Sequence, residues 1–391
     1  MLLSLSLIMI VGFSLSGILG KLRLPGLLGM IMTGIALGPY ALDLISDDIL
    51  NISAELRQIA LIIILTRAGL AIDIKDLKRV GRPAILMCFV PATFEIVAVT
   101  LLAPPLLGVS ILEAAIMGAV LAAVSPAVIV PRMLHLMESG YGKDKSIPQL
   151  IMAGASVDDI YVIVLFTAFM GIYSGSGFDA SAIISVPIAI LLGMLLGTFS
   201  GLILVWIFKK FHMRDTVKVL ILLSTAFLFV SLETFLKPYV PVSGLLAVMA
   251  LGAALLKSYE VLAKRLKGKF SKIWVGAEIM LFVLVGAAVD VRYLLFAGFG
   301  AVLLIALALL IRMVGVQLSL AKTQLTFKER LFCSIAYLPK ATVQAAVGAI
   351  PLSAGVAAGQ TILAVAVLAI MITAPLGAIG IDATYKKWLT K

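Results

Sequence analysis

Long runs of mostly apolar residues recur thirteen times along the chain, separated by short polar segments. Each run is close to the roughly 20 residues that an α-helix needs to cross a bilayer. The pattern predicts membrane-spanning helices at residues 2–20, 24–40, 54–72, 83–103, 111–136, 148–172, 180–209, 215–235, 239–257, 273–290, 294–320, 329–352 and 359–381. Because no polar segment is long enough for a soluble domain, we expect an all-α polytopic membrane protein that works inside the bilayer.

The composition supports this fold class. Of the 391 residues 62% are hydrophobic and only 13% are charged, and the mean hydropathy is +1.18. These values exclude a disulfide-rich secreted scaffold, a coiled coil and a disordered chain. The two cysteines, Cys88 and Cys333, both lie inside apolar runs, where they are interpreted as packing residues.

The net charge of +11 is distributed very unevenly between the two sides of the predicted membrane. When the loops are numbered alternately, one side holds 25 of the 31 Lys and Arg residues, and the other holds only Arg57, Lys237 and Arg292. Positive loops stay in the cytoplasm, which predicts an external N-terminus and a cytoplasmic C-terminus. The basic excess is therefore a topology signal, and no nucleic-acid partner is expected.

The two ends of the chain add two expectations. Lys21 and Arg23 follow the first apolar run, which is the opposite polarity from a cleavable signal peptide, so we expect this run to stay in the mature protein. Only a short segment follows the last run, which suggests a minimal form in a prokaryotic inner membrane.

An internal repeat relates the two halves of the chain. At a shift of 217 residues, Gly69–Ile74 aligns with Gly286–Val291, and Glu95 falls on Arg312. The match pairs the third span with the tenth, seven helices apart, so the two copies run in opposite directions through the membrane. Such inverted repeats are typical of secondary transporters, and they favour an alternating-access carrier over a passive cation channel.

Ionisable residues inside the predicted spans are candidates for function, because charge in hydrocarbon is costly. There are seven of them: Arg67, Glu95, Asp158, Asp159, Glu278, Arg312 and Lys340. Arg67 and Glu278 lie only about 7–9 Å from a cytoplasmic end and can reach it with their long side chains. The other five lie about 15–18 Å from a cytoplasmic end, near the midplane of a ~30 Å core. We therefore expect those five to meet in one layer.

Asp158 and Asp159 are neighbours on one predicted helix, so their side chains diverge by about 100°. They cannot share one proton as the two carboxylates of an aspartyl protease do, which argues against a membrane protease. Apolar residues continue from Ile160 to Phe169, so the pair does not end the helix. We expect one carboxylate to face a water-filled cavity and the other to hold a basic partner.

The basic residues of this layer differ in chemistry. Glu95 and Arg312 are interpreted as an ion pair between the two repeats, and since arginine keeps its proton, a structural or gating role is favoured. Lys340 is different, because a desolvated lysine can release its proton. It is therefore either a fixed counter-charge or a second proton site.

Two prolines at the same depth predict interrupted helices. Pro126 follows Ser125 in the fifth span, and Pro339 precedes Lys340 in the twelfth. Proline removes an intrahelical hydrogen bond, and a broken helix exposes carbonyl and N–H groups that can help to bind ions. The alternative is a simple kink at each proline.

Together these features resemble a known family. They are Val-Asp-Asp-Ile at 157–160, Leu-Pro-Lys-Ala-Thr-Val-Gln-Ala-Ala at 338–346, Gly-Leu-Ala-Ile-Asp at 69–73, and the mid-membrane Glu95 and Arg312. The chain resembles the cation/proton antiporters, and within them the paired-aspartate branch of NHA-type sodium/proton exchangers and their bacterial relatives. The resemblance implies a NhaA-like fold of about thirteen helices with two broken crossing helices. It also implies a homodimeric transporter, neither an enzyme nor dependent on a cofactor, that works by elevator-type alternating access.

The resemblance also implies a division of the chain. Residues 83–172 and 294–391 would form the mobile transport core, the latter with a short cytoplasmic tail. Residues 1–82 and 215–293 would form the dimerisation scaffold, joined to the core through a linker helix at 173–214.

By similarity, Asp159 would be the carboxylate that exchanges a cation for a proton, with Asp158 beside it. Ser125 and Thr342 are candidates to complete an oxygen site for Na⁺ or Li⁺, and Lys340 is the charge-compensating residue.

Departures from the family leave alternatives open. Many electrogenic bacterial relatives have lysine where this chain has Arg312, and others have aspartate where it has Ser125. Stoichiometry and ion choice stay open, with a mild preference for electroneutral exchange because Arg312 cannot release a proton. A K⁺/H⁺ antiporter and a sodium-coupled organic-anion symporter of the same architecture are the alternative functions.

Overall fold

The computed structural model describes residues 1–22, 24–71, 81–174, 180–236, 240 and 242–391. Over these residues the regular structure is helical, which confirms the predicted fold class. The helices are α1 (Leu2–Lys21), α2 (Gly26–Leu37), α3 (Asp47–Asn51), α4 (Ser53–Gly69), α6 (Arg82–Met87), α7 (Val90–Leu107), α8 (Ile111–Ala122), α9 (Pro126–Ser139), α10 (Ile147–Ser174), α11 (Ala180–Lys210), α12 (Asp215–Leu236), α13 (Gly244–Ser258), α14 (Glu260–Ala287), α15 (Val291–Ser319), α16 (Phe327–Ala336), α17 (Thr342–Val347), α18 (Ile350–Ser353) and α19 (Gly359–Trp388).

Eight segments of the described residues are long and apolar enough to cross a membrane, and shorter apolar helices accompany them. The chain is an integral, multi-pass membrane protein. Every predicted span overlaps at least one of the observed helices. The main differences are at the ends: α14 begins at Glu260 and α19 continues to Trp388, well beyond the predicted bounds. Those extensions carry many lysines, so a hydropathy pattern does not detect them although they are helical.

Some sequence features lie outside the described residues. These are the end of the first repeat copy, 72–74, and the basic residues Arg23, Lys75, Lys78, Arg79 and Lys237.

The helices gather into two compact units. Unit 1 comprises residues 1–54, 73–166 and 281–391, and unit 2 comprises residues 55–72 and 167–280. The chain passes from one unit to the other near the start of α4, within α10 and within α14. Every group of the candidate site described below belongs to unit 1.

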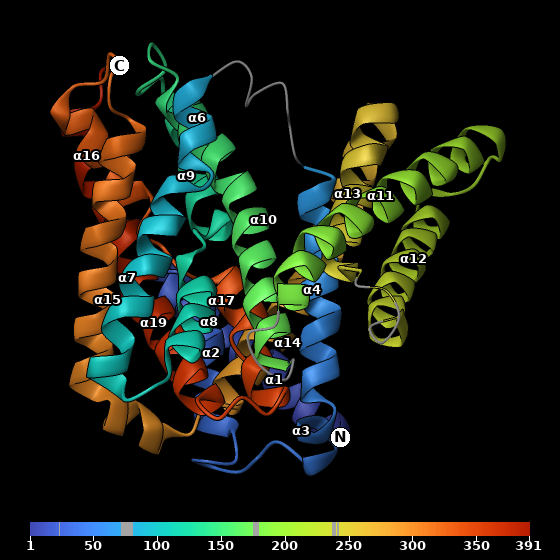
Figure 1. Ribbon diagram of the computed structural model, residues 1–391, viewed down its shortest axis with the longest axis horizontal. Helices are drawn as coiled ribbons and strands as arrows, with labels where there is room; N and C mark the ends of the chain where they lie inside the picture. The colour runs from blue at the N-terminus through green and yellow to red at the C-terminus, as the bar shows by residue number, and fades with distance from the viewer. Residues whose placement is uncertain (23, 72–80, 175–179, 237–239, 241) are drawn as a thin grey trace. The chain divides into compact units, whose positions relative to one another are not determined.

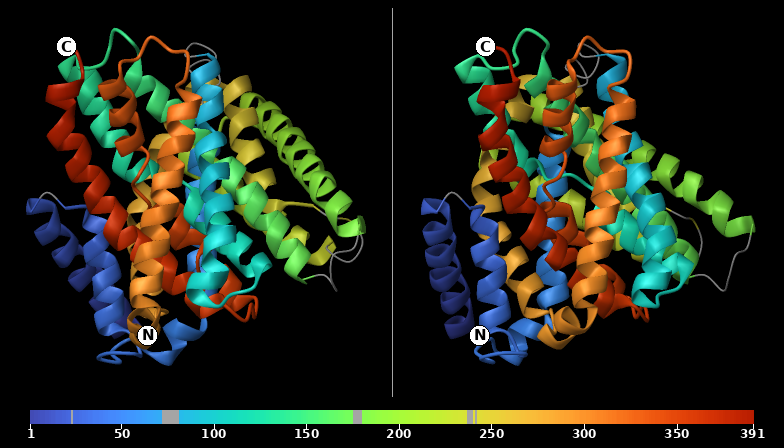
Figure 2. Two further views of the ribbon diagram at one scale, coloured as in Figure 1. Left: turned by 60° about the vertical axis from the view of Figure 1, so that its left-hand side comes forward. Right: turned by 90° about the vertical axis from the view of Figure 1, so that its left-hand side faces the viewer.

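In unit 1, α7 packs against α8 and α15, and α19 packs against α15, α16 and α18. The two chain termini, both in this unit, lie at opposite ends of it (Figure 1 and Figure 2). The loop between α9 and α10 lies at the C-terminal end, where the Gly142 N–H donates to the Thr390 carbonyl at 2.7 Å. Within this unit, therefore, the N-terminus and the C-terminal tail face opposite directions.

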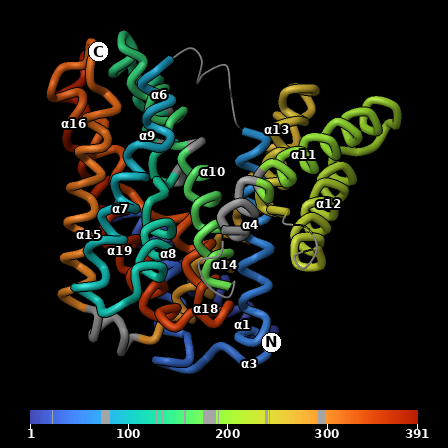
Figure 3. Tube along the Cα trace, viewed as in Figure 1, coloured from blue at the N-terminus to red at the C-terminus, as the bar shows by residue number. Residues whose placement is uncertain are grey.

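Glycines allow close backbone contacts, as is common between membrane helices. In unit 1 a Cβ atom on Gly34 of α2 would overlap the Val283 carbonyl of α14, and one on Gly286 would overlap the Ile31 carbonyl. In unit 2, α11 and α12 both pack against α13, and the tube in Figure 3 follows these three helices. Gly197 of α11 is in direct contact with the backbone of α13 at Ala247.

Two of the membrane segments in unit 1 are interrupted. The first consists of α8 and α9, separated by extended residues 123–125, with Pro126 as the first residue of α9. The second consists of α16 and α17, separated by residues 337–341. The two interruptions touch, because the Ser125 N–H donates to the Pro339 carbonyl at 2.9 Å. Residues far apart in sequence thus meet at one crossing point.

Candidate functional site

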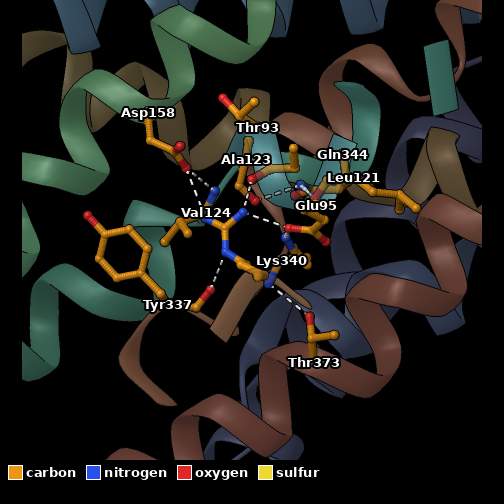
Figure 4. Close-up of polar contacts among 12 residues, drawn as sticks. Thr93, Glu95, Leu121, Ala123, Val124, Asp158, Tyr337, Lys340, Gln344 and Thr373 are labelled. Carbon is orange, nitrogen blue, oxygen red and sulfur yellow. Dashed lines mark hydrogen bonds and ion pairs between the residues drawn. The ribbon is translucent and has the colours of Figure 1, made fainter. Parts of the chain in front are cut away.

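A buried arginine links the two interrupted segments. The Arg312 guanidinium on α15 forms ion pairs with Glu95 of α7 (Nη1 to Oε2, 2.6 Å) and with Asp158 of α10 (Nη2 to Oδ2, 3.3 Å). It also donates to the Tyr337 carbonyl at 3.0 Å and to the Ala122 carbonyl at the end of α8. The side chain is fully buried, and Figure 4 labels three of its partners, Asp158, Glu95 and Tyr337. Arg312 therefore pairs with two acids and contacts the backbone at both helix interruptions.

Lys340 supplies the second positive charge. Its ammonium lies 2.6 Å from Oε2 of Glu95, the same oxygen that Arg312 binds. Its backbone N–H donates to Thr373 Oγ1 of α19 at 2.9 Å. Glu95 is 2% exposed and Lys340 is 1% exposed, so these charges are removed from water. Two acids, Glu95 and Asp158, and two bases make a cluster with no net charge, which reduces the cost of burying it.

The neighbouring aspartates have different surroundings. Oδ2 of Asp158 accepts from the Val124 N–H at 2.9 Å as well as from Arg312. Asp159 is also buried, with 8% of its surface exposed, yet among the described residues it forms no ion pair. Its Oδ1 has no hydrogen-bond partner there. A bare charged carboxylate is costly in such a place, which sets Asp159 apart from Asp158.

Five buried side-chain oxygens in this region lack a hydrogen-bond partner among the described residues. They are Oδ1 of Asp158, Oδ1 of Asp159, Oγ of Ser125, Oγ1 of Thr342 and the hydroxyl of Tyr337. Oxygen donors of this kind suit a hard cation. No group of three or more His, Cys, Asp or Glu residues in the described part of the chain is arranged to hold a metal ion. The unpartnered oxygens are therefore candidate ligands for a hard cation.

Gln344 is a site residue that sequence reasoning missed. Its Nε2 donates to the carbonyls of Leu121 and Ala123 at 3.1 and 2.8 Å, and its Oε1 accepts from the Ala341 N–H at 2.8 Å. The prolines led us to expect exposed carbonyls at the interruptions, but these carbonyls already accept hydrogen bonds. A polar amide in an otherwise apolar helix beside a predicted break was the signal that could have identified it.

Thr373 and Tyr337 were also missed. Thr373 lies in the apolar α19, and Tyr337 contributes a backbone carbonyl, so neither stands out in the sequence.

Arg67 and Glu278, which are predicted to reach the membrane surface, lie in unit 2. They are partly buried and interact electrostatically with each other.

This combination defines a class of protein. Two interrupted membrane segments from opposite halves of the chain cross at a buried, charge-balanced cluster, beside a carboxylate that has no ion pair in the described part of the chain. This is the architecture of an inverted-repeat secondary transporter. Residues 5–387 match the family described as "Sodium/hydrogen exchanger, transmembrane". The chain belongs to this family, which confirms the resemblance to cation/proton antiporters.

Individual relatives agree. The chain is 34% identical over 375 residues to sodium/hydrogen exchanger 9B2 of Mus musculus, covering 91% of this chain and 67% of the relative. It is 32% identical over 380 residues to sodium/hydrogen exchanger 9B1 of Homo sapiens, covering 94% of this chain and 73% of the relative.

A solved structure has the same fold. The sodium proton antiporter MjNhaP1 from Methanocaldococcus jannaschii superposes with a TM-score of 0.83 over 99% of this chain and 98% of that one, at 21% identity.

Proposed function

We propose that this chain exchanges Na⁺ for H⁺ across a membrane by alternating access, and that the two ions compete for the Asp159 carboxylate. The observation that carries the proposal is the unpaired, buried Asp159 beside a cluster whose four charges already balance. Membership of the sodium/hydrogen exchanger family supports it, because the relatives named above are sodium/hydrogen exchangers. Those relatives are transporters, and no cofactor enters the scheme.

Competition at one carboxylate is sufficient for coupling. With the site open to one side, Asp159 either holds a proton or holds Na⁺, and in each case the site crosses without an exposed negative charge. The unpartnered oxygens of Asp158, Ser125 and Thr342 are the proposed additional ligands, and Li⁺ would use the same set. In this scheme Lys340, whose ammonium lies beside Glu95, is the charge-compensating residue.

The larger organisation is proposed by similarity. Residues 83–172 and 294–391 form the moving core, residues 1–82 and 215–293 form the scaffold of a homodimer, and residues 173–214 link them. The protein lies in a prokaryotic inner membrane, with its N-terminus on the outer side and its C-terminus on the cytoplasmic side. The opposite directions of the two termini in unit 1 and the basic residues of the loops support this orientation.

The alternatives are not favoured. A sodium-coupled organic-anion symporter or a K⁺/H⁺ antiporter would use the same architecture, but the matched family and the relatives are sodium/hydrogen exchangers.

The test is a comparison of Asp159→Asn with the parent in everted membrane vesicles. Adding NaCl or LiCl to acidified vesicles with the parent protein should dissipate the pH gradient, whereas Asp159→Asn should behave like vesicles without the protein. Asp144→Asn, the same change at an exposed loop position, is the matched control and should keep full activity. For the parent, the half-activating Na⁺ concentration should rise as pH falls, because protons occupy the same carboxylate. Dissipation by Asp159→Asn at the parent rate would disprove the site assignment.

A further inference from the structure

The end of α8 is a place where a cation ligand would be expected. The last carbonyls of a helix have no intrahelical partner and carry the negative end of the helix dipole. When such an end lies inside a membrane protein, its carbonyls are natural ligands for an alkali ion.

In this chain side chains of the second repeat occupy those carbonyls. Gln344 donates both N–H groups of its amide, one to the Leu121 carbonyl and one to the Ala123 carbonyl. Arg312 donates to the carbonyl between them, that of Ala122. Three successive carbonyls at the break are thereby engaged, and Figure 4 shows Gln344 beside Leu121 and Ala123.

Other carbonyls at the crossing are engaged as well. The Pro339 carbonyl accepts from the Ser125 N–H, and the Ser125 carbonyl accepts from the N–H groups of Val128 and Ile129. The contrast with the side chains is clear, because the hydroxyl groups of Ser125 and Thr342 have no partner among the described residues. These backbone oxygens accept hydrogen bonds, whereas the two hydroxyl oxygens have no partner among the described residues.

We propose that Gln344 is a specificity-determining residue of the exchange reaction, because it withholds the Leu121 and Ala123 carbonyls from the transported cation. The inference rests on the proposed Na⁺/H⁺ exchange at Asp159. With Gln344 in place, the cation is bound by carboxylate and hydroxyl oxygens, a small and strongly polar set. Without it, two carbonyls become free, and carbonyl-rich coordination is the kind that replaces the hydration shell of K⁺.

Gln344 is well suited to this positioning role. It is fully buried, and all three of its amide hydrogen bonds are made within the crossing. Its Oε1 also accepts from the Ala341 N–H, just before α17, so the same side chain fixes the start of one helix relative to the end of the other.

The experiment measures cation preference in proteoliposomes containing the full-length purified protein. Half-activating concentrations of Na⁺, Li⁺ and K⁺ for proton efflux are determined for the parent and for Gln344→Leu, which has no donor groups. Removing the donors leaves two buried carbonyls without partners, so we expect the Na⁺ over K⁺ preference to fall by about tenfold or more. Gln317→Leu is the control. Gln317 is also a glutamine of unit 1, but its amide donates to Ser334 on α16 at 2.9 Å, and its loss should leave the preference unchanged.

The outcomes are distinct. The inference is overturned if Gln344→Leu keeps the parental ratio of half-activating concentrations for Na⁺, Li⁺ and K⁺. It is also overturned if activation by all three cations weakens to the same degree, because that is the result of a purely structural role. If the parent itself shows no Na⁺-driven proton flux, the proposed function fails instead.

A second variant tests the inference even if Gln344→Leu folds poorly. Gln344→Met keeps the length of the side chain but removes the donors. Its thermal stabilisation by NaCl and by KCl in detergent reports binding without transport. Relative stabilisation shifted toward KCl supports the inference, and the parental ratio overturns it.

Discussion

Asp158 and Asp159 show how two identical side chains acquire different roles from their surroundings. Asp158 has its charge balanced by Arg312 and accepts a backbone N–H from Val124. Asp159, one residue further along α10, has neither of these among the described residues. The first carboxylate is therefore held by its partners, whereas the second is the one that the proposed function assigns to ligand exchange.

This difference predicts opposite effects on stability. Asp158→Asn leaves the buried Arg312 undercompensated, so we expect a loss of about 3–5 kcal/mol in the free energy of unfolding. Asp159→Asn removes an unpaired buried carboxylate, and we expect its unfolding temperature to equal or exceed that of the parent. Thermal unfolding of the two purified variants in one detergent at neutral pH measures the difference. Equal destabilisation by both substitutions would contradict the distinction.

Part of the site could be predicted from single residues. The depth of each ionisable residue along its span is enough to place Glu95, Asp158 and Arg312 in one layer, because helical rise is constant. Partner choice does not follow from depth. That Arg312 binds Asp158 while Lys340 shares Glu95 depends on how the helices are rotated, which hydropathy does not report.

At the scale of elements, the two interrupted segments begin in the same way. Ser110 and Glu113 form a capping box at the start of α8, and Thr326 and Glu329 form one at the start of α16. Each glutamate also reaches the loop before the last helix of the other repeat. Glu113 Oε1 accepts from the Ala358 N–H at 3.0 Å, just before α19. Glu329 pairs at 2.7 Å with Lys145, just before α10. The inverted repeat thus extends to these connections.

The Lys145–Glu329 connection yields a stability prediction. Glu329 is 1% exposed, so Lys145→Met leaves a buried carboxylate without its cation, and we expect a loss of about 1–3 kcal/mol in the free energy of unfolding. Lys143→Met, at an exposed position of the same loop, is the matched control and should change stability little. Thermal unfolding of both variants in detergent measures the effect. Indistinguishable unfolding temperatures for the two variants would show that the connection does not contribute.

Elements were the most predictable level of this protein. Membrane helices have to be apolar over a fixed length, so the described helices can be located approximately from hydropathy, and the prolines indicate where two of the membrane segments are interrupted. The capping boxes are also readable as Ser/Thr-x-x-Glu patterns. The basic start of α14 was missed because it is helical without being apolar.

At the scale of the whole molecule, the ion pairs join the two repeats. Glu95 and Arg312 occupy corresponding positions at the shift of 217 residues, yet they carry opposite charges and bind each other. An inverted repeat of identical charges would place like charges together at the crossing, with mutual repulsion. Because one half has an acid where the other has a base, the charges at the crossing of this symmetric fold neutralise each other.

This neutral centre predicts the stoichiometry of transport. Glu95, Asp158, Arg312 and Lys340 balance one another, and in the proposed function Asp159 is the group that changes occupancy. If Lys340 stays protonated and paired with Glu95, one Na⁺ replaces one H⁺ and no net charge crosses the membrane. We therefore expect the Na⁺-driven proton flux in proteoliposomes to be the same with and without a potassium–valinomycin clamp. Lys340→Gln should lower stability without making the remaining flux voltage-dependent. A parental flux that changes several-fold with the imposed potential would instead require Lys340 to release a proton on cation binding.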